Sequence, residues 1–171
     1  YDVDILVNNA GQGQYGEFSD TNIYRELSII QLNISSLVVL TKLFLQDMLK
    51  KGRGKILNLS SIASKTPGPL HSVYHGTKAF VQSFSQSIAE EVRDKGITVT
   101  ALLPGATDTD FFNKADMQQS KVVKEGKLDD ASVVAQHGYD ALMKGEQMVV
   151  SGFKNKVKVA MSNVLSDKKA A

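Results

Sequence analysis

Tyr74 and Lys78 are the residues of this sequence whose types and spacing most directly suggest chemistry. They stand four positions apart in a segment with a helical pattern, so their side chains share one face of the expected helix. A free tyrosine has a pKa of about 10, and a nearby ammonium group favours the phenolate and lowers that pKa. Such a pair suits proton transfer to a carbonyl or alcohol oxygen. The alternative is two solvated residues on a helix, since this spacing arises easily by chance.

Ser61 stands at the carboxyl end of an apolar run, 55–60, that predicts a strand. Sheets with alternating strands and helices bind their ligands at this end of the strands. The alternative is a serine that merely opens a loop. A Ser-His-Asp hydrolase is disfavoured, because its nucleophile turn needs G-x-S-x-G and the sequence NLSSIA does not supply it.

Asn33 is a polar residue inside an apolar helical pattern, where asparagine is unfavourable by propensity. It is expected either to be a hydrogen-bonded core residue or to bend the helix and bind water. The residue alone favours the first alternative.

Three glycines, Gly11, Gly13 and Gly16, form a G-x-G-x-x-G pattern directly after an apolar run. In a dinucleotide-binding turn the last glycine opens directly into a helix, and an acidic residue follows about 20 positions later. Here the helix is expected only near Asp20, and the later position falls in mid-helix at Ser35. A glycine-rich loop at a strand end is therefore favoured over a phosphate-binding loop.

Strands and helices alternate along the chain and must position these residues. Strands are expected at 4–9, 55–60, 97–103 and 147–152, and helices at 20–50, 73–94, 130–144 and 153–165. The first helix is expected to begin at a cap formed by Ser19 or Asp20, and the last helix is amphipathic. Apolar strands separated by helices are typical of a parallel sheet covered on both faces. The sequence predicts one α/β domain, or part of one.

Composition and charge narrow the function classes. The formal net charge is +2, and no block of like charges indicates a nucleic-acid surface. Cysteine is absent, which excludes disulfides and thiolate chemistry. The histidines lack metal-site spacing, so no metal is expected; they are interpreted as surface or loop residues: His71, His75 and His137. No membrane span is expected either, because charged and polar residues interrupt the apolar region 23–48.

Taken together, these residues resemble the short-chain dehydrogenase/reductase family. The sequence YHGTK at 74–78 matches the Tyr-x-x-x-Lys signature of that family. Ser61 lies 13 residues before Tyr74, and Asn33 lies 28 residues before Ser61, which matches its Asn-Ser-Tyr-Lys tetrad. NNAG at 8–11 is similar to a motif that follows the fourth strand of the family.

The resemblance continues after the tyrosine and covers about 4–152. Pro104-Gly105 lies 30 residues after Tyr74, and Thr109 matches the threonine of the Pro-Gly-x-x-x-Thr segment of the family. The family begins with a strand, a T-G-x-x-x-G-x-G turn and two further strands, which do not occur here. The resemblance implies a partial Rossmann-like, doubly wound parallel sheet with strands four to seven, as a single partial domain over 1–171. Strand 4–9 would then be an edge with uncovered apolar surface.

The resemblance also implies roles for the tetrad in hydride transfer between NAD or NADP and a carbonyl/alcohol pair. Tyr74 would be the general acid/base, and Lys78 would lower its pKa and hold the nicotinamide ribose. Ser61 would stabilise charge on the substrate oxygen, and Asn33 would support a water in a proton relay. The implied cofactor-binding residues are Asn9, Ala10, Gly11, Tyr74, Lys78, Pro104, Gly105, Thr107 and Thr109.

Further expectations concern the loop, the partners and the location. Residues 108–128 would close over a small-molecule substrate, with apolar contacts from Phe111, Phe112 and Met117, and the last helix would pack beside that site. Helices 20–50 and 73–94 would form the interface of a homodimer or homotetramer. No signal peptide is seen, so a cytoplasmic location is expected, although the sequence does not begin with Met.

Two alternatives to an active oxidoreductase share part of this pattern. One is a catalytically inactive fragment that acts only as a folding, oligomerisation or binding module. The other is a sugar-nucleotide epimerase, which also uses Tyr-x-x-x-Lys. The epimerase is disfavoured because too few residues follow Pro104 for its larger substrate domain.

Overall fold

The structure, a computed structural model, describes residues 2–162, without the side chains of Glu125 and Ser162. Its strands are β1 (Ile5–Asn8), β2 (Gly54–Leu59), β3 (Ile97–Leu103) and β4 (Met148–Val150). Its helices are α1 (Ile23–Ile30), the π-helix η1 (Gln31–Ser36), α2 (Leu37–Lys51), the 3-10 helix η2 (Ile62–Lys65), α3 (Ser72–Glu91), α4 (Phe111–Lys114), α5 (Lys121–Glu125), α6 (Ala131–Lys144) and α7 (Phe153–Ser162). The expected strands and long helices are all present. Residues 163–165, where the last helix is expected to end, lie outside the described residues.

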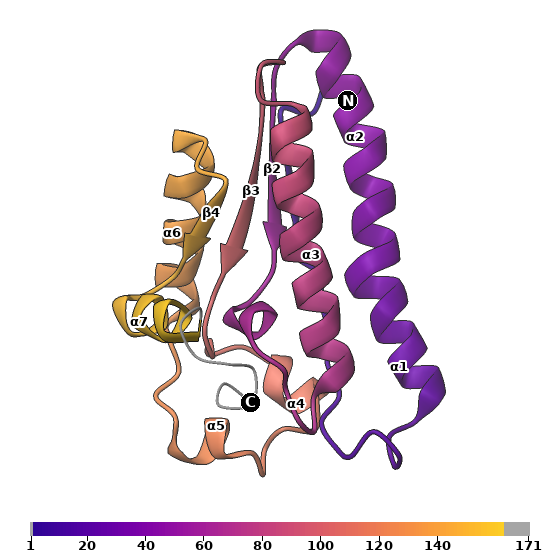
Figure 1. Cartoon of the computed structure of the whole chain (residues 1–171), viewed down its shortest axis with the longest axis vertical. Coiled ribbons are helices and arrows are strands. Elements are labelled where there is room, and N and C mark those ends of the chain that lie inside the picture. Colours follow the sequence, from indigo (N-terminus) through magenta and orange to yellow (C-terminus); the bar gives the residue numbers. More distant parts are fainter. Residues whose placement is uncertain (1, 163–171) are drawn as a thin grey trace.

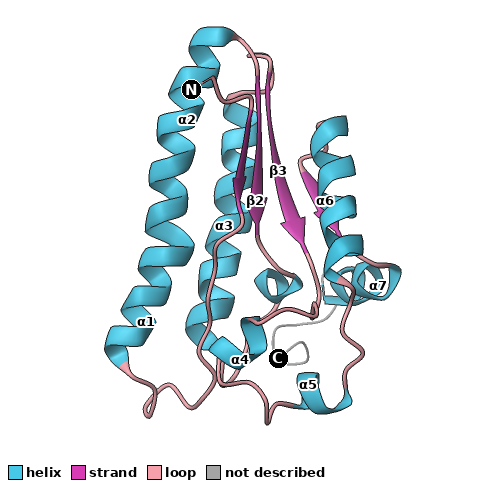
Figure 2. Cartoon of the chain, turned by 180° about the vertical axis from the view of Figure 1, so that it is seen from behind, coloured by secondary structure: helices cyan, strands magenta, loops and turns pink. Residues whose placement is uncertain are grey.

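The strands form one parallel sheet in the order β1-β2-β3-β4, which confirms the predicted α/β fold. Helices α1, α2 and α3 cover one face of the sheet and α6 covers the other, as Figures 1 and 2 show from opposite sides. Each crossover carries the chain back to the same end of the sheet. All strand ends that are followed by a functional candidate therefore meet at one edge.

Two apolar clusters fix the helices on the sheet. Between the sheet and helices α2 and α3 lies a buried cluster of Met48, Ile56, Ala89, Val92, Ile97 and Val99. On the other face, α6 packs on the strands through Leu57, Leu102, Val134 and Leu142. Because both clusters are built from alternate residues of the same strands, the strand register is tied to the packing of both layers.

A row of buried polar side chains crosses the same sheet. Asn8 donates hydrogen bonds to Thr41 Oγ1 on α2 (3.0 Å) and to Asn58 Oδ1 on β2 (2.8 Å). Asn58 in turn donates to Ser85 Oγ on α3 (2.9 Å). Asn8 and Asn58 are register partners in the sheet. Since a buried polar group without a partner is costly, this row disfavours any slip of β1 along β2.

The long first helix begins later than expected. The prediction of a cap at Ser19 or Asp20 was wrong: the cap is Asn22, whose side-chain oxygen accepts from the backbone N–H of Tyr24 (2.9 Å) and Arg25 (3.2 Å). The helix ends at Lys51, one residue after the expected end, and is capped by Gly52 in the left-handed conformation with φ 67°. A π-helical segment, Gln31–Ser36, interrupts it in the middle.

The helix Ile23–Lys51 is, by length and composition alone, long and apolar enough to cross a membrane. That finding corrects the expectation that the polar residues of this region exclude such a stretch. A core helix of a soluble domain passes the same test, so the finding is weak evidence for a membrane. Here the helix packs on the sheet through Met48 and buries the polar residues Asn33 and Thr41.

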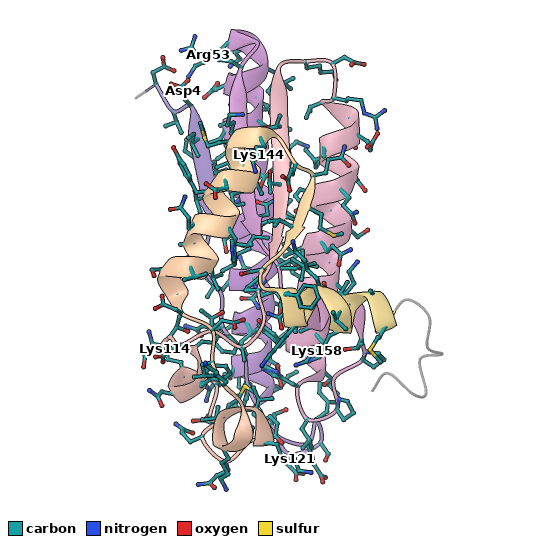
Figure 3. All side chains as sticks on the ribbon, turned by 90° about the vertical axis from the view of Figure 1, so that its left-hand side faces the viewer. Asp4, Arg53, Lys114, Lys121, Lys144 and Lys158 are labelled. Atoms are coloured by element: carbon teal, nitrogen blue, oxygen red, sulfur yellow. The ribbon has the colours of Figure 1, made fainter. Side chains whose placement is uncertain are left out.

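The segment 108–128, expected to be a loop that closes over the substrate, contains two short helices and a small core. Phe112, Ala115 and Met117 are buried there and pack against Tyr15 from the loop after β1. A hydrogen bond from Tyr15 N to Ala115 O (2.9 Å) joins the same two segments. In Figure 3, Lys114 and Lys121 of this segment lie at the opposite end of the molecule from Asp4 and Arg53.

Within the described residues β1 is an edge of the sheet, as expected. Its apolar side chains Ile5 and Val7 are 41% and 52% exposed. An edge strand with exposed apolar side chains and free backbone groups can pair with a further strand.

Candidate active site

A cavity of about 1230 Å³ lies at the carboxyl ends of the strands and continues along the sheet toward α6 and α7. The predicted site residues that line it are Asn9, Gly11, Ser61, Tyr74, Lys78, Pro104, Gly105, Thr107 and Thr109. Two predicted residues, Ala10 and Asn33, do not line it. Phe111, Phe112 and Met117 contribute apolar walls, and α7 closes one side with residues that include Asn155 and Lys158.

Tyr74 lies in the first turn of α3 and is half-buried in the wall of this cavity. Its ring stacks on the imidazole of His71, with ring centroids 4.4 Å apart and planes inclined by 11°. The ring of Phe111 lies on it as well, 5.1 Å away between centroids. These aromatic contacts hold the phenol in one orientation.

Lys78 lies one turn further along α3 and is 4% exposed. Its Nζ donates a hydrogen bond to the backbone oxygen of Leu59 at the end of β2 (2.7 Å). The same Nζ lies 5.7 Å from the centroid of the Tyr74 ring. The expected i, i+4 pairing of Tyr74 and Lys78 on one helix face is therefore present.

Burial, rather than the ammonium group, dominates the ionisation of this pair. It raises the pKa of Tyr74 to about 12, with the neighbouring Ser61 hydroxyl acting in the opposite direction. It lowers the pKa of Lys78 to about 8. In the absence of a cofactor, burial thus opposes the pKa-lowering role that the resemblance gives to Lys78. Lys78 is buried and Tyr74 is half-buried in the same cavity wall, and charging a poorly solvated group costs free energy.

Ser61 follows β2 and caps the 3-10 helix η2. Its Oγ accepts from Ala63 N (3.1 Å) and lies 3.5 Å from the backbone oxygen of Pro104, at the limit of a hydrogen bond. The adjacent Ser60 does not share this role, since its hydroxyl donates to the Lys78 backbone oxygen (2.8 Å). Ser61 lines the cavity with its hydroxyl only weakly engaged as a donor, which suits a group that hydrogen-bonds an incoming oxygen.

Asn33 is a fully hydrogen-bonded core residue, the first of the two expected alternatives. Its Nδ2 donates to Gln12 O (2.8 Å) and Thr77 Oγ1 (3.0 Å), and its Oδ1 accepts from Gln12 N (2.9 Å). Thr77 in turn donates to the backbone oxygen of Tyr74 (2.8 Å). Asn33 thus ties the loop after β1 to the helix that carries Tyr74. It lies in the π-helical segment, a type of interruption that is frequent at functional sites.

The glycines of the G-x-G-x-x-G pattern make room for these side chains. A Cβ on Gly11 would lie 3.2 Å from Lys78 Nζ and 3.4 Å from Asn33 Oδ1. On Gly13 it would lie 2.5 Å from His71 Nε2 and 3.0 Å from Phe111. Gly16 has φ 151°, a conformation that other residues rarely adopt. The helix that follows this loop begins only at Ile23, and Gly11 and Gly13 let side chains of the site approach the loop closely.

His71 was missed as a site residue. It was interpreted as a surface or loop residue, but it is 7% exposed and lines the cavity against Tyr74. His75 Nδ1 donates a hydrogen bond to Thr66 O (2.8 Å), and His137 lies on α6 with Nδ1 2.9 Å from Ser151 Oγ. Within residues 2–162 no group of three or more potential ligand residues is arranged to hold a metal ion. The only sequence signal for His71 is its position three residues before Tyr74, near the start of the same helix.

Several known proteins resemble this chain in sequence. A sequence model described as short chain dehydrogenase matches residues 1–120. An uncharacterized oxidoreductase of Staphylococcus epidermidis is 32% identical over 133 residues, which cover 78% of this chain and 58% of the relative. The 3-oxoacyl-acyl-carrier-protein reductase of Haemophilus influenzae is 36% identical over 138 residues, which cover 78% of this chain and 57% of the relative.

Solved structures share the fold. A short-chain dehydrogenase from Sphingobium yanoikuyae in complex with NADPH is 27% identical and superposes with a TM-score of 0.81. The match covers 96% of this chain and 65% of that structure. The chain therefore spans less than two thirds of the length of these two curated relatives and of this structure.

Proposed function

This chain belongs to the short-chain dehydrogenase/reductase family, and on that premise we propose that the protein is an NAD(P)-dependent carbonyl reductase or alcohol dehydrogenase. The observation that carries the proposal is the meeting of Ser61, Tyr74 and Lys78 in one cavity at the carboxyl ends of the strands. Such a set can position a carbonyl oxygen and exchange a proton with it while a hydride moves at the carbon.

Tyr74 is proposed as the general acid/base that exchanges the proton with the substrate oxygen. Its ring is fixed by His71 and Phe111, so the hydroxyl is presented to the cavity in one orientation. The Ser61 hydroxyl is proposed to donate a hydrogen bond to the same oxygen and to stabilise the charge that develops on it. For reduction Tyr74 gives its proton to that oxygen, and for oxidation it takes the proton back.

The side chains on one side of the cavity fit a nicotinamide cofactor. An ammonium group has three N–H donors, and among the described residues Lys78 uses one of them on Leu59 O. The others suit the ribose hydroxyls. Gly11 leaves the space beside this ammonium open because it has no Cβ. When bound, the cofactor would supply or accept the hydride, and the residues proposed to border it are Asn9, Ala10, Gly11, Pro104, Gly105, Thr107 and Thr109.

Asn33 is proposed to act through the backbone of the loop and helix that it joins. Its side-chain hydrogen bonds fix Gln12 and, through Thr77, the first turns of α3. The water relay that the resemblance implies remains part of the proposal, with Asn33 fixing the backbone around it.

The substrate is proposed to be a small carbonyl or alcohol compound with apolar substituents. Its pocket would be formed by Phe111, Phe112 and Met117, from the segment 108–128 that is proposed to close over it. Closure of this segment would exclude water from Tyr74 and Ser61. An inactive binding module has less support, because such a module needs no convergence of acid/base side chains on one cavity.

A homodimer through α1, α2 and α3 is proposed from the apolar side chains exposed there. The exposed apolar residues on α1 and α2 are Ile23, Tyr24, Leu27, Val39, Leu40, Leu43 and Leu49, and α3 adds Phe80. In Figure 1 these helices form one layer on the face of the sheet opposite α6. An exposed apolar surface of this kind marks an interaction site. Leu43→Glu should turn a dimer into a monomer, as measured by light scattering. Val133→Glu, at a similarly exposed position on α6, should leave the dimer intact. A wild-type monomer would refute the interface.

The function is tested with the full-length protein, the proposed location of which is the cytoplasm. Wild-type protein and Tyr74→Phe are titrated with NADPH and NADH by fluorescence and then assayed with a panel of ketones and aldehydes. Tyr74→Phe should bind the cofactor with nearly the wild-type affinity and show no turnover. Turnover by Tyr74→Phe would contradict the role of Tyr74, and absence of cofactor binding by the wild type would contradict the function itself.

A further inference from the structure

His71 lies where three segments of the site meet. It immediately precedes α3, and its backbone N–H and C=O are engaged with Gly68 O (3.0 Å) and His75 N (3.1 Å). The side chain is buried between the phenol of Tyr74, on which it stacks, and the rings of Tyr15 and Phe111. Those last two rings belong to the loop after β1 and to the segment after β3.

The loop after β1 is shaped to admit this imidazole. A Cβ on Gly13 would lie 2.5 Å from His71 Nε2, so only glycine leaves the ring in place. The same loop is bonded to both neighbouring segments, through Tyr15 N to Ala115 O (2.9 Å) and Gly16 N to Leu70 O (2.8 Å). The ring of His71 thus fills the centre of a closed arrangement of three segments.

The chemistry of His71 differs from that of an acid/base residue. Its Nε2 is fully buried and has no hydrogen-bond partner among the described residues. Burial lowers the pKa of His71 to about 4, and the nearby His75 acts in the same direction. The titratable groups that face it are Tyr15, Tyr74 and His75. At neutral pH the ring is therefore uncharged, and what it offers Tyr74 is a flat, closely stacked surface.

From this geometry we propose that His71 is a positioning residue, whose ring plane holds Tyr74 in its reactive orientation and joins it to Phe111 of the segment 108–128. The proposal rests on the proposed function, since it concerns the orientation of the same acid/base residue. Movement of Phe111 away from His71 would remove one of the ring contacts that hold Tyr74 in place. The orientation of the Tyr74 phenol therefore depends on the position of the segment 108–128.

The test compares His71→Phe, which keeps a flat ring, with His71→Leu, which keeps similar bulk without one. In the full-length protein His71→Leu should lower kcat about 10- to 100-fold while leaving the KM for NADPH nearly unchanged, because a misplaced acid/base group costs about that much. His71→Phe should retain most of kcat and the wild-type pH profile. His137→Leu, a histidine on α6 outside the cavity, is the matched control and should leave kcat unchanged.

A second measurement does not need turnover. The titration of Tyr74 is followed by ultraviolet absorbance as the difference between each protein and its Tyr74→Phe derivative. In wild type and His71→Phe the tyrosine should titrate well above its ordinary pKa. In His71→Leu its pKa should move down toward about 10, because a branched side chain of similar bulk does not cover the flat face of the phenol from water. This shift without any turnover would support the positioning and sink the proposed function.

Three results overturn the inference. Equal kcat in His71→Leu and His71→Phe would mean that the ring plane has no part in holding Tyr74. Loss of a limb of the pH profile in His71→Phe would mean that the imidazole nitrogens exchange protons. An unchanged titration of Tyr74 in His71→Leu would mean that the stacking does not control its surroundings.

Discussion

Lys78→Met should make the cofactor-free, full-length protein more stable at neutral pH, although it removes a residue proposed to be essential for function. The ammonium of Lys78 is buried, and its pKa is lowered from 10.5 to about 8. A depressed lysine pKa means that folding disfavours the charged form. Below pH 8 the folded protein therefore carries a cost, which is relieved as the pH rises from about 8 toward 10.5 because the unfolded chain then binds more protons.

The size of this cost follows from the shift in the pKa of Lys78. A shift of about 2.5 units corresponds to roughly 3 kcal/mol at pH 7, and only about 1 kcal/mol of it remains at pH 10. Methionine removes the charge, but it leaves the Leu59 carbonyl without the hydrogen bond from Nζ, which offsets about 1–2 kcal/mol. Lys78→Met should thus be about 1–2 kcal/mol more stable than wild type at pH 7, and this advantage should vanish near pH 10.

Urea denaturation of both proteins at pH 7 and pH 10 measures this difference. Lys144→Met, at the exposed end of α6, is a matched control whose free energy of unfolding should stay within about 0.5 kcal/mol of wild type. If wild type is the more stable protein at both pH values, with an unchanged gap, the burial of Lys78 carries no such cost. The reasoning about the ionisation of the Tyr74–Lys78 pair would then be refuted.

Two further substitutions probe how the loop after β1 is held, with the melting temperature as the measurement. Gly13→Ala should lower the free energy of unfolding by about 1–3 kcal/mol, because the new methyl group meets His71 and Phe111. Gly76→Ala, with open space around it on α3, is the control and should be neutral or stabilising. Equal melting temperatures of the two variants would contradict the close packing of His71 against Gly13. Asn33→Ala should lower the free energy of unfolding by about 2–4 kcal/mol, because it leaves the backbone N–H and C=O of Gln12 unpaired. Asn113→Ala, at an exposed position, is the control and should cost little. A small loss of stability in Asn33→Ala would show that water replaces the side chain.

The regular elements were predictable because their signals are local. The strand 97–103 was predicted with the observed bounds, and the helix expected at 130–144 is α6, which is capped by Asp130 and Gly145. The helix start was wrong because Ser19, Asp20 and Asn22 are all good caps, and which of them bonds the first N–H groups depends on the turn that precedes them. The interruption at 31–36 also has no clear local signal.

The sequence predicted which residues form the site better than it predicted how they ionise. Spacing placed Ser61, Tyr74 and Lys78 together, and they do line one cavity. The pKa directions of Tyr74 and Lys78 were not predictable from spacing, because they depend on burial that packed elements create. The burial of His71 depends on Gly13, which is 58 positions away in the sequence, so only the folded chain shows why both residues have these identities.

Transfer of a hydride in the Tyr74 cavity is tested most directly with NADPH carrying deuterium at the transferable position. The full-length protein is incubated with this cofactor and a ketone that it turns over, and the alcohol is analysed by mass spectrometry. Wild type should place one deuterium on the carbinol carbon, and Tyr74→Phe should form no alcohol although it binds the cofactor. Unlabelled alcohol from the wild type, or labelled alcohol from Tyr74→Phe at the wild-type rate, would contradict the proposed chemistry.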